Sequence, residues 1–431
     1  MGSLKDLGHP FGVWGETAPP CPALPKFSGA QTVDIAIVGA GYTGLSAALH
    51  LAKVGARCAV LEAFEPGWGE SGRNTGWMEP NWWMKDPALI RARFGAERGN
   101  ELTQIVASGP ALLSRWIAEY GLAIEWDPCG LVMATADSRQ ALKLAQESRD
   151  WQSLGIDHPY LDESAMGRYV AGSYFKGGLW LKGGATLNPL ALSRELCRAA
   201  IEAGAQVHVH SPVRSIKQNK GLWELTSDGG TLTCRTLLLA TGVSTGTLWP
   251  RIASAQAEWH AAVIASDPYD ALDDLLPAGS AVADLNFTNI LTLRRAAGNR
   301  LVTSVLAPAL PNGDAGSVAV PFMRKFRRLF PHFPEPRWRY LHYGKIGLSR
   351  DMLPRLCQLG PNAWTAFGYS GTGINYAVLF GRFLAELALS DGHAETAWPV
   401  EPLAPYPLRR TVGAALRYLH APVSRNILSR L

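Results

Sequence analysis

Runs and periodic repeats of apolar residues along the 431-residue chain predict short strands that alternate with longer helices. The predicted strands are 34–38, 56–62, 179–181, 206–210, a hairpin at 222–234, then 236–242, 257–266, 290–294, 300–306 and 363–367. The predicted helices are 43–54, 86–120, 137–155, 188–204, 318–330 and the helix after the glycine turn of 368–392. This order predicts an α/β fold, and the strands within 257–306 predict a separate sheet.

Composition narrows the class of protein. Apolar residues make up 47% and charged residues 18%, which is typical of a packed soluble globule, and the scattered net charge of +5 gives no indication of a nucleic-acid partner. The six cysteines form no CxxC pair, so we expect free thiols in a reducing cytoplasm and no metal site. The N-terminal sequence does not resemble a signal peptide, and no apolar run reaches the about 18 residues that a membrane span needs.

The segment between Asp34 and Glu62 carries the strongest chemical signal. A strand leads into G-x-G-x-x-G at Gly39, Gly41 and Gly44, a helix follows, and a second strand ends at Glu62. Gly39 allows the tight turn, Gly41 lets a pyrophosphate approach the backbone, and Gly44 lets the helix pack on the sheet. The helix N-terminus would bind the pyrophosphate, and Glu62 would accept hydrogen bonds from the ribose hydroxyls, which disfavours NADP. The pattern predicts an FAD or NAD site, against the alternative of a glycine turn without a ligand.

Three further features favour FAD over NAD. A glycine-rich loop with Ser-Gly-Arg-Asn at 71–74 could supply polar groups to a flavin. A late strand ends at Thr241 and Gly242, where it could close over the adenosine side. The glycines of 368–373 open a long helix, whose N-terminus would stabilise negative charge on the reduced ring. Each feature taken alone could also be a structural turn.

Seven motifs occur in a fixed order along most of the chain. They are WGETAP (14–19), GAGYTGLSAALHLA (39–52), LEAFEPGWGESGRN (61–74), LNPLALSRELCRAAIEAGAQVHVHSPV (187–213), LLLATG (237–242), GKIGLSRDMLPRLCQLG (344–360) and GYSGTGINYAVLFGRFLAE (368–386). In these motifs the chain resembles the D-amino-acid oxidase-like superfamily of FAD-dependent oxidoreductases, and within it the gamma-glutamylputrescine oxidase branch. Several motifs in order make this resemblance more specific than the glycine pattern alone.

The resemblance implies a two-domain α/β fold. A discontinuous FAD-binding Rossmann-type domain carries a second, mixed-sheet α+β substrate domain over the flavin ring. The expected segments are an extended N-terminal arm at 1–30, an FAD-binding domain at 31–115, 165–255 and 344–395, a substrate domain at 116–164 and 256–343, and a C-terminal tail at 396–431. We expect a monomer or small homo-oligomer, with the tail packed as a helix on its own domain rather than on a membrane.

The resemblance also implies which residues hold FAD. Val213 would meet the adenine through its backbone, and Ser71, Arg73 and Asn74 would lie near the ring. Relatives tether flavin through a cysteine where this chain has Gly344, which predicts a noncovalent cofactor. The expected cofactor residues are Gly39, Gly41, Tyr42, Thr43, Gly44, Glu62, Ala63, Trp68, Gly69, Ser71, Gly72, Arg73, Asn74, Thr75, Val213, Thr241, Gly242, Gly344, Gly371, Thr372, Gly373 and Ile374.

The reaction implied by the resemblance is oxidation of a C–N bond in a primary or secondary amine, with polyamine conjugates among the candidates. A neutral amine would pass a hydride to flavin N5, the imine would hydrolyse to an aldehyde, and O2 would reoxidise the flavin to give H2O2. Asn375 stands where sarcosine-oxidase relatives carry a lysine for the substrate carboxylate, which argues against an α-amino acid. Two alternatives stay open: a dehydrogenase of an amino or hydroxy acid that passes electrons to a quinone or other carrier, and a non-catalytic dinucleotide-binding protein.

Four residues are candidates for the chemistry itself. Trp77, with the nearby Trp82 and Trp83, could wall the substrate pocket and bind the amine cation. His260 could orient the substrate or assist proton removal. His342 and Tyr343 could approach the flavin face. For each of these residues, a structural place in the core or in a sheet is the alternative.

Overall fold

The structure is a computed structural model of the chain, and it describes every residue except 1–10, 285–290, 307–314, 391–392, 394 and 413–431. Most of the predicted C-terminal helix therefore lies outside the described residues. The helices of the described chain, with the two short 3-10 turns η2 and η3, are α1 (Trp14–Thr17), α2 (Tyr42–Lys53), η2 (Glu70–Gly72), α3 (Pro87–Phe94), α4 (Ala96–Ala107), α5 (Gly109–Tyr120), α6 (Ser138–Ser153), α7 (Glu163–Met166), α8 (Pro189–Glu202), η3 (Gly242–Thr245), α9 (Pro250–Ser254), α10 (Leu272–Leu275), α11 (Ala315–Leu329) and α12 (Gly373–Leu389).

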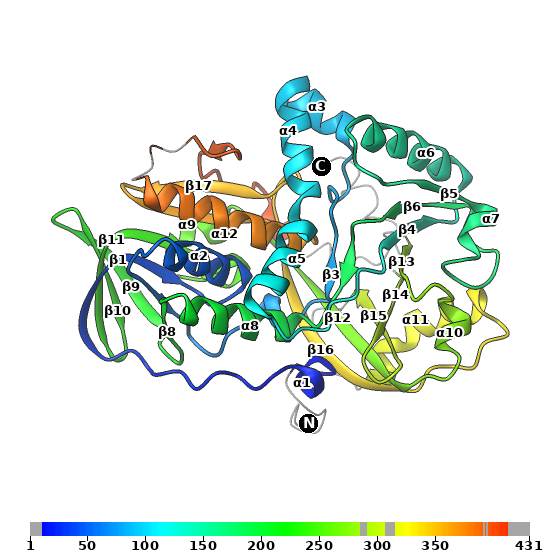
Figure 1. Cartoon of the computed structure of the whole chain (residues 1–431), viewed down its shortest axis with the longest axis horizontal. Coiled ribbons are helices and arrows are strands. Elements are labelled where there is room, and N and C mark those ends of the chain that lie inside the picture. The colour runs from blue at the N-terminus through cyan, green and yellow to red at the C-terminus, as the bar shows by residue number, and fades with distance from the viewer. Residues whose placement is uncertain (1–10, 285–290, 307–314, 391–392, 394, 413–431) are drawn as a thin grey trace.

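The strands fall into two large sheets and one short pair, and the two sheets lie on opposite sides of the view in Figure 1. They are β1 (Gly29–Val38), β2 (Cys58–Leu61), β3 (Trp77–Met78), β4 (Leu131–Thr135), β5 (Tyr160–Asp162), β6 (Gly177–Leu181), β7 (Ala185–Thr186), β8 (Gln206–His208), β9 (Val213–Asn219), β10 (Leu222–Ser227), β11 (Gly230–Leu239), β12 (Ala257–Pro268), β13 (Ala281–Asp284), β14 (Leu291–Ala296), β15 (Arg300–Leu306), β16 (Trp338–Leu348), β17 (Arg355–Gly360), β18 (Ala363–Phe367) and β19 (Val400–Glu401).

The first sheet is built around the parallel strands that the apolar runs predict. Among the described residues its order is β19-β17-β18-β11-β1-β2-β8, and β10 and β9 extend it from β11 as antiparallel neighbours. β1 lies between β2 and β11, so that Ile35 pairs with Cys58 on one side and with Thr236 on the other. Because a central parallel strand is covered on both faces, 35–38 is a continuous apolar run without polar alternation.

β11 corrects one prediction. The second arm of the predicted hairpin and the strand predicted at 236–242 form a single strand, Gly230–Leu239, which ends three residues earlier. No glycine or proline interrupts 231–239, and the whole of β11 pairs in parallel with β1, which has the same length. The continuous partner strand therefore explains why the two predicted pieces join.

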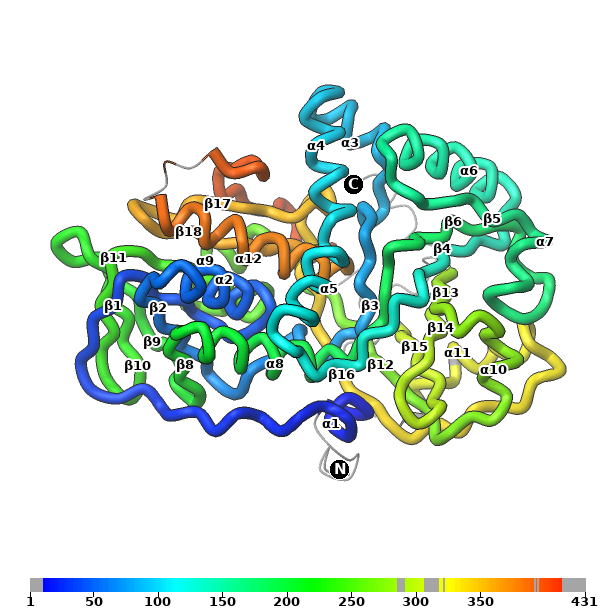
Figure 2. The backbone as a smooth tube through the Cα atoms, viewed as in Figure 1, coloured from blue at the N-terminus to red at the C-terminus, as the bar shows by residue number. Residues whose placement is uncertain are grey.

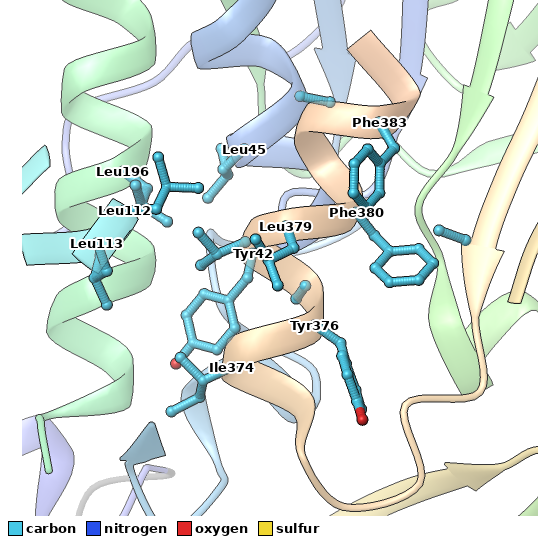
Figure 3. Close-up of a cluster of buried hydrophobic side chains, with 14 of the residues drawn as sticks. Tyr42, Leu45, Leu112, Leu113, Leu196, Ile374, Tyr376, Leu379, Phe380 and Phe383 are labelled. Atoms are coloured by element: carbon cyan, nitrogen blue, oxygen red, sulfur yellow. The ribbon is translucent and has the colours of Figure 1, made fainter. Parts of the chain in front are cut away.

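Helix α2 packs against both α8 and α12 beside the first sheet (Figure 1). Figure 3 shows apolar side chains of this layer, among them Tyr42, Leu45, Leu196, Leu379 and Phe380. They come from helices that lie far apart in the sequence and share one buried cluster. Burial of this shared apolar face holds the N-terminal and C-terminal parts of the chain together.

The second sheet has the order β16-β12-β15-β14-β13-β4-β6-β5 in the described residues, and it is mixed, since β13 pairs in parallel with β4 while the other neighbours are antiparallel. Helix α11 covers one face through apolar residues such as Phe322 and Phe326. The predicted α/β architecture with a second, mixed sheet is therefore confirmed. Four strands of this sheet, β4, β5, β13 and β16, were not predicted from the sequence.

Sheet membership does not fix domain boundaries, so the segments expected for the two domains stay a prediction. β6 lies in the second sheet, although it falls within 165–255, which is expected to belong to the FAD-binding domain. The expected extended arm contains the short helix α1 and then runs along the first sheet to β1, as the blue tube of Figure 2 shows. No helix in the described part of the chain is long and apolar enough to cross a membrane.

The contact between α2 and α12 gives a stability prediction. A Cβ on Gly381 of α12 would lie 2.4 Å from the Cβ of Ser46 in α2. We expect Gly381→Ala to force the helices apart and to lower the free energy of unfolding by about 2 kcal/mol, as overpacking does. The control is Gly183→Ala, in the exposed turn after β6, where a Cβ would meet nothing within 4 Å. Equal unfolding curves for the two variants would contradict the prediction.

Candidate active site

A cavity of about 630 Å³ lies between the first sheet and the second. Its wall contains the C-terminal ends of the parallel strands of the first sheet, with Val38 from β1, Leu61 from β2 and Phe367 from β18. Ligands of open α/β sheets bind at this end of the strands, because the turns that follow them are free to form a site.

One face of the second sheet forms the opposite wall. In β12 the side chains of Ala261 and Val263 line the cavity, while Ala262 and Ile264 pack in the cluster under α11. In β14, Thr292 lines the cavity while its two neighbours pack under the helix. The two-residue period of a strand thus gives the second sheet one face for its core and one for a ligand.

The glycine turn at the end of β1 has the shape of a phosphate cradle. Gly39 has φ +105°, and a Cβ there would lie 2.8 Å from the carbonyl oxygen of Ala240. A Cβ on Gly41 would lie 2.9 Å from Oγ of Ser71. Gly41 caps α2 without any side-chain hydrogen bond, and the N–H of Tyr42 donates to Ser71 Oγ at 3.1 Å. Backbone N–H groups at this helix N-terminus therefore face the cavity, where they suit an anionic pyrophosphate.

Glu62 stands beside this turn. Its two carboxylate oxygens accept hydrogen bonds from the N–H of Ala40 at 2.7 Å and the N–H of Phe64 at 2.9 Å. Burial raises the pKa of Glu62, while these backbone donors act in the opposite direction. The carboxylate is fixed in the cavity wall with acceptor capacity left for ribose hydroxyls. Val213 lines the same cavity.

The loop after Glu62 is held by its own side chains. The guanidinium of Arg73 lies over the ring of Trp68 at 5.0 Å and over that of Phe11 at 5.4 Å. Asn74 donates through Nδ2 to the carbonyl oxygens of Glu70 and Ser71, each at 3.0 Å. These contacts fix Ser71, Arg73 and Asn74 in the wall of the cavity.

Arg294 of β14 supports the same loop from the second sheet, a role that was not predicted from the sequence. Its guanidinium donates to the carbonyl oxygens of Thr75 at 2.7 Å, Gly76 at 3.0 Å and Leu187 at 2.9 Å. The side chain is buried and lies over the ring of Trp14, and burial lowers its pKa to about 10. An arginine inside a strand carried no sequence signal, because its three partners are backbone atoms distant in sequence.

The tryptophans after this loop separate into two groups. Trp77 and Trp83 line the cavity, and between them Glu79 lines it as well. Trp82 is instead buried in the core, where its Nε1 donates to Oγ1 of Thr103 at 3.1 Å. The structure thus brings two of the three tryptophans to the cavity, together with a carboxylate that the sequence analysis did not single out.

The other three candidates for the chemistry do not line the cavity. His260 contacts Glu258 through Nε2 at 2.6 Å. His342 is buried under the N-terminal segment, where a Cβ on Gly12 would lie 2.3 Å from its Nδ1. Burial, with the charge of Arg73 acting in the same direction, lowers the pKa of His342 to about 3, so its ring is neutral near pH 7. Burial also raises the pKa of Tyr343. These positions give no support to a catalytic role for the three residues.

The expected cofactor residues line the cavity with three exceptions, Gly44, Gly72 and Thr372. Gly44 serves packing, because a Cβ there would lie 2.0 Å from the carbonyl oxygen of Gly39. Gly72 is similar, with a Cβ 2.3 Å from the carbonyl oxygen of Gly67. Thr372 is buried at the start of α12.

Comparison with known proteins agrees with this geometry. The family described as FAD dependent oxidoreductase matches residues 34–387 of the chain. The chain belongs to this family. Its members use FAD, so the choice between FAD and NAD that the glycine pattern left open is resolved in favour of FAD.

Individual relatives match most of the length of this chain. Gamma-glutamylputrescine oxidoreductase of Escherichia coli (strain K12) is 30% identical over 387 residues, or 88% of this chain and 89% of that protein. The structure of glycine oxidase from Geobacillus kaustophilus matches with a TM-score of 0.72 at 21% identity, covering 86% of this chain and 97% of the other. The structure of L-proline dehydrogenase from P. horikoshii matches with a TM-score of 0.71 at 16% identity, covering 90% of this chain and 99% of the other. The resemblance seen in the motifs is therefore confirmed, and the two structures confirm the fold.

The cavity fits FAD. The glycine turn and the first turn of α2 would hold the pyrophosphate, and Glu62 would hold the ribose. None of the six cysteines lines the cavity, and Cys357 is buried in β17. A thiol tether to the flavin is thus missing from the cavity wall, which supports the expectation of a noncovalent cofactor.

Glu62 gives a prediction about cofactor affinity. We expect Glu62→Ala to weaken FAD binding by about tenfold or more, because a buried carboxylate that accepts hydrogen bonds from the backbone and the ribose is lost. Reconstitution of the apoprotein, followed by the change in flavin fluorescence, measures the dissociation constant. The matched control is Glu65→Ala, three residues further along and outside the cavity wall, which should bind FAD as the wild type does. Unchanged affinity in Glu62→Ala would contradict the assignment.

Proposed function

We propose that the protein oxidises a C–N bond of an amine, with O2 as the electron acceptor. The observation that carries the proposal is the wall of the cavity beyond the glycine turn, where Trp77, Glu79 and Trp83 line the cavity together with one face of the second sheet. FAD held in this cavity would supply the two-electron acceptor for oxidation of the C–N bond to an imine, and O2 would take up the two electrons as H2O2. The imine then hydrolyses to an aldehyde.

The charges in the cavity wall favour an amine over an α-amino acid. A free substrate carboxylate needs a cationic side chain, and the lysines and arginines among the described lining residues are Arg73 and Lys345. Arg73 is stacked on two aromatic rings, and Nζ of Lys345 lies 3.2 Å from Glu258. Asn375, which stands where sarcosine-oxidase relatives carry a lysine for the substrate carboxylate, donates to the carbonyl oxygen of Val106 at 2.9 Å and does not line the cavity.

The relatives support the same class of substrate. The E. coli relative is named for gamma-glutamylputrescine, a polyamine conjugate, whereas glycine oxidase and L-proline dehydrogenase are named for amino acids. Sequence identity is higher to the relative named for an amine conjugate. We therefore place polyamine conjugates first among the candidate substrates, with cytoplasm as the expected location.

An anaerobic screen of the yellow holoenzyme tests the proposal. Primary and secondary amines, polyamine conjugates and N-methyl amino acids are mixed with the enzyme, and loss of the oxidised flavin absorption is recorded, with simple hydroxy acids as the comparison set. We expect amines to bleach the flavin and air to restore the colour with release of H2O2. Bleaching by amines without H2O2 in air would indicate the dehydrogenase alternative, and bleaching only by hydroxy acids would contradict the proposal.

A further inference from the structure

Glu79 lies in the extended segment that continues β3. Trp77 and Glu79 line the cavity, whereas Met78 between them does not line it and is fully buried. The alternation of an extended chain therefore turns the indole and the carboxylate toward the same space. Glu79 is only 6% exposed, so its carboxyl group is turned into the cavity rather than toward bulk water.

Among the described residues, Glu79 has no cationic partner. The other acid on the substrate side of the wall, Asp284 of β13, is paired with Nζ of Lys325 at 2.5 Å. Asp284 is thus neutralised by a lysine of the chain, whereas Glu79 meets no such cation among the described residues. Burying an ionised carboxylate without a counter-charge costs free energy of desolvation, and the attraction of a cationic ligand would offset that cost.

The groups packed around Glu79 explain its protonation. Burial raises the pKa of Glu79 to about 8, while the hydroxyl of Thr372 acts in the opposite direction. Tyr376 of α12 faces it, and the pKa of that phenol is raised by burial and by the charge of Glu79. Asp284 lines the same cavity from β13 and is paired with Lys325 of α11. Glu79 is therefore largely neutral at pH 7 in the free site and ionises when the pH rises through about 8 or when a cation arrives.

Aromatic rings complete a cation site. Trp77 and Trp83 line the cavity on either side of Glu79 in the sequence, and a Cβ on Gly371 would lie 3.1 Å from the ring of Trp83. Indole faces attract cations, and a carboxylate adds a full opposite charge.

We propose that Glu79, with Trp77 and Trp83, binds the cationic nitrogen of the substrate, so that the substrates are ammonium compounds that need no free α-carboxylate. This inference rests on the proposed amine oxidation and extends it to the residue that receives the amine. The same carboxyl group can hold the proton that the ammonium must lose before it is oxidised.

The test uses a permanent cation, so that it does not depend on turnover. Choline carries a quaternary nitrogen without a lone pair, and 3,3-dimethyl-1-butanol is its neutral counterpart of the same shape. Each is titrated into the holoenzyme, and binding is followed by the change in the flavin absorption spectrum and by calorimetry. We expect choline to bind at least tenfold more tightly than the alcohol, and Glu79→Gln to remove this preference while FAD content stays unchanged.

The pH dependence separates a charge effect from a change in shape. Because a raised carboxyl pKa favours the neutral form, choline affinity should rise with pH up to about 8 and then level off. Glu79→Asp should retain a preference for choline, and in Glu79→Gln the pH dependence should be lost. The matched control is Glu147→Gln on α6, since burial also raises the pKa of Glu147, to about 7, but that residue lies outside the cavity. It should behave as the wild type.

The choline titrations decide whether Glu79 binds a cation. If the wild type binds choline no better than the alcohol, or if Glu79→Gln retains the preference and its pH dependence, Glu79 does not bind a cation. Failure of the proposed function would look different: choline binding would depend on Glu79, while no amine would bleach the flavin. If an amine substrate is found, its KM should rise at least tenfold in Glu79→Gln, and an unchanged KM would also overturn the inference.

Discussion

The structure depends on the close contact between the start of α2 and the turn that leaves β1. At position 44 a side chain would meet the carbonyl oxygen of Gly39 at 2.0 Å, so the helix can begin directly at the strand end only with glycine there. Because it begins there, the N–H groups of its first turn face the same space as Glu62, which ends up beside the turn through the pairing of β1 with β2. The cofactor half of the cavity follows from this one contact.

The second sheet forms the other wall of the cavity and holds the loop that follows Glu62 in place. Arg294 reaches from β14 to three carbonyl oxygens, two of them in the loop that carries Ser71, Arg73 and Asn74. This loop is thus fixed by a residue of the opposite sheet. Since the strand period turns one face of this sheet to α11 and the other to the cavity, substitutions at cavity-facing positions can change the substrate without disturbing the core.

The sequence predicted what depends on local pattern. The glycine turn, β1, α2, β2 and α12 were all predicted, because apolar runs and glycines mark them, and family membership confirmed FAD. The sequence did not predict what depends on packing between distant segments: strands β4, β5, β13 and β16 of the second sheet were missed, and Arg294 gave no signal. His342 illustrates the same limit, since only the fold shows that Gly12 and Trp14 cover it. The motif resemblance predicted the cofactor residues. The burial of Glu79 could not be predicted from the sequence, because it depends on how distant segments pack around the cavity.

The central claim is that one cavity holds the phosphates of FAD against the glycine turn and its ring against the second sheet. A crystal structure of the protein with FAD, determined together with choline, tests this directly. The account predicts the ribose at Glu62, the pyrophosphate at the N-terminus of α2, and the ring between Gly371 and the face of β12 and β14. FAD bound elsewhere, or with its ring turned away from the second sheet, would contradict it.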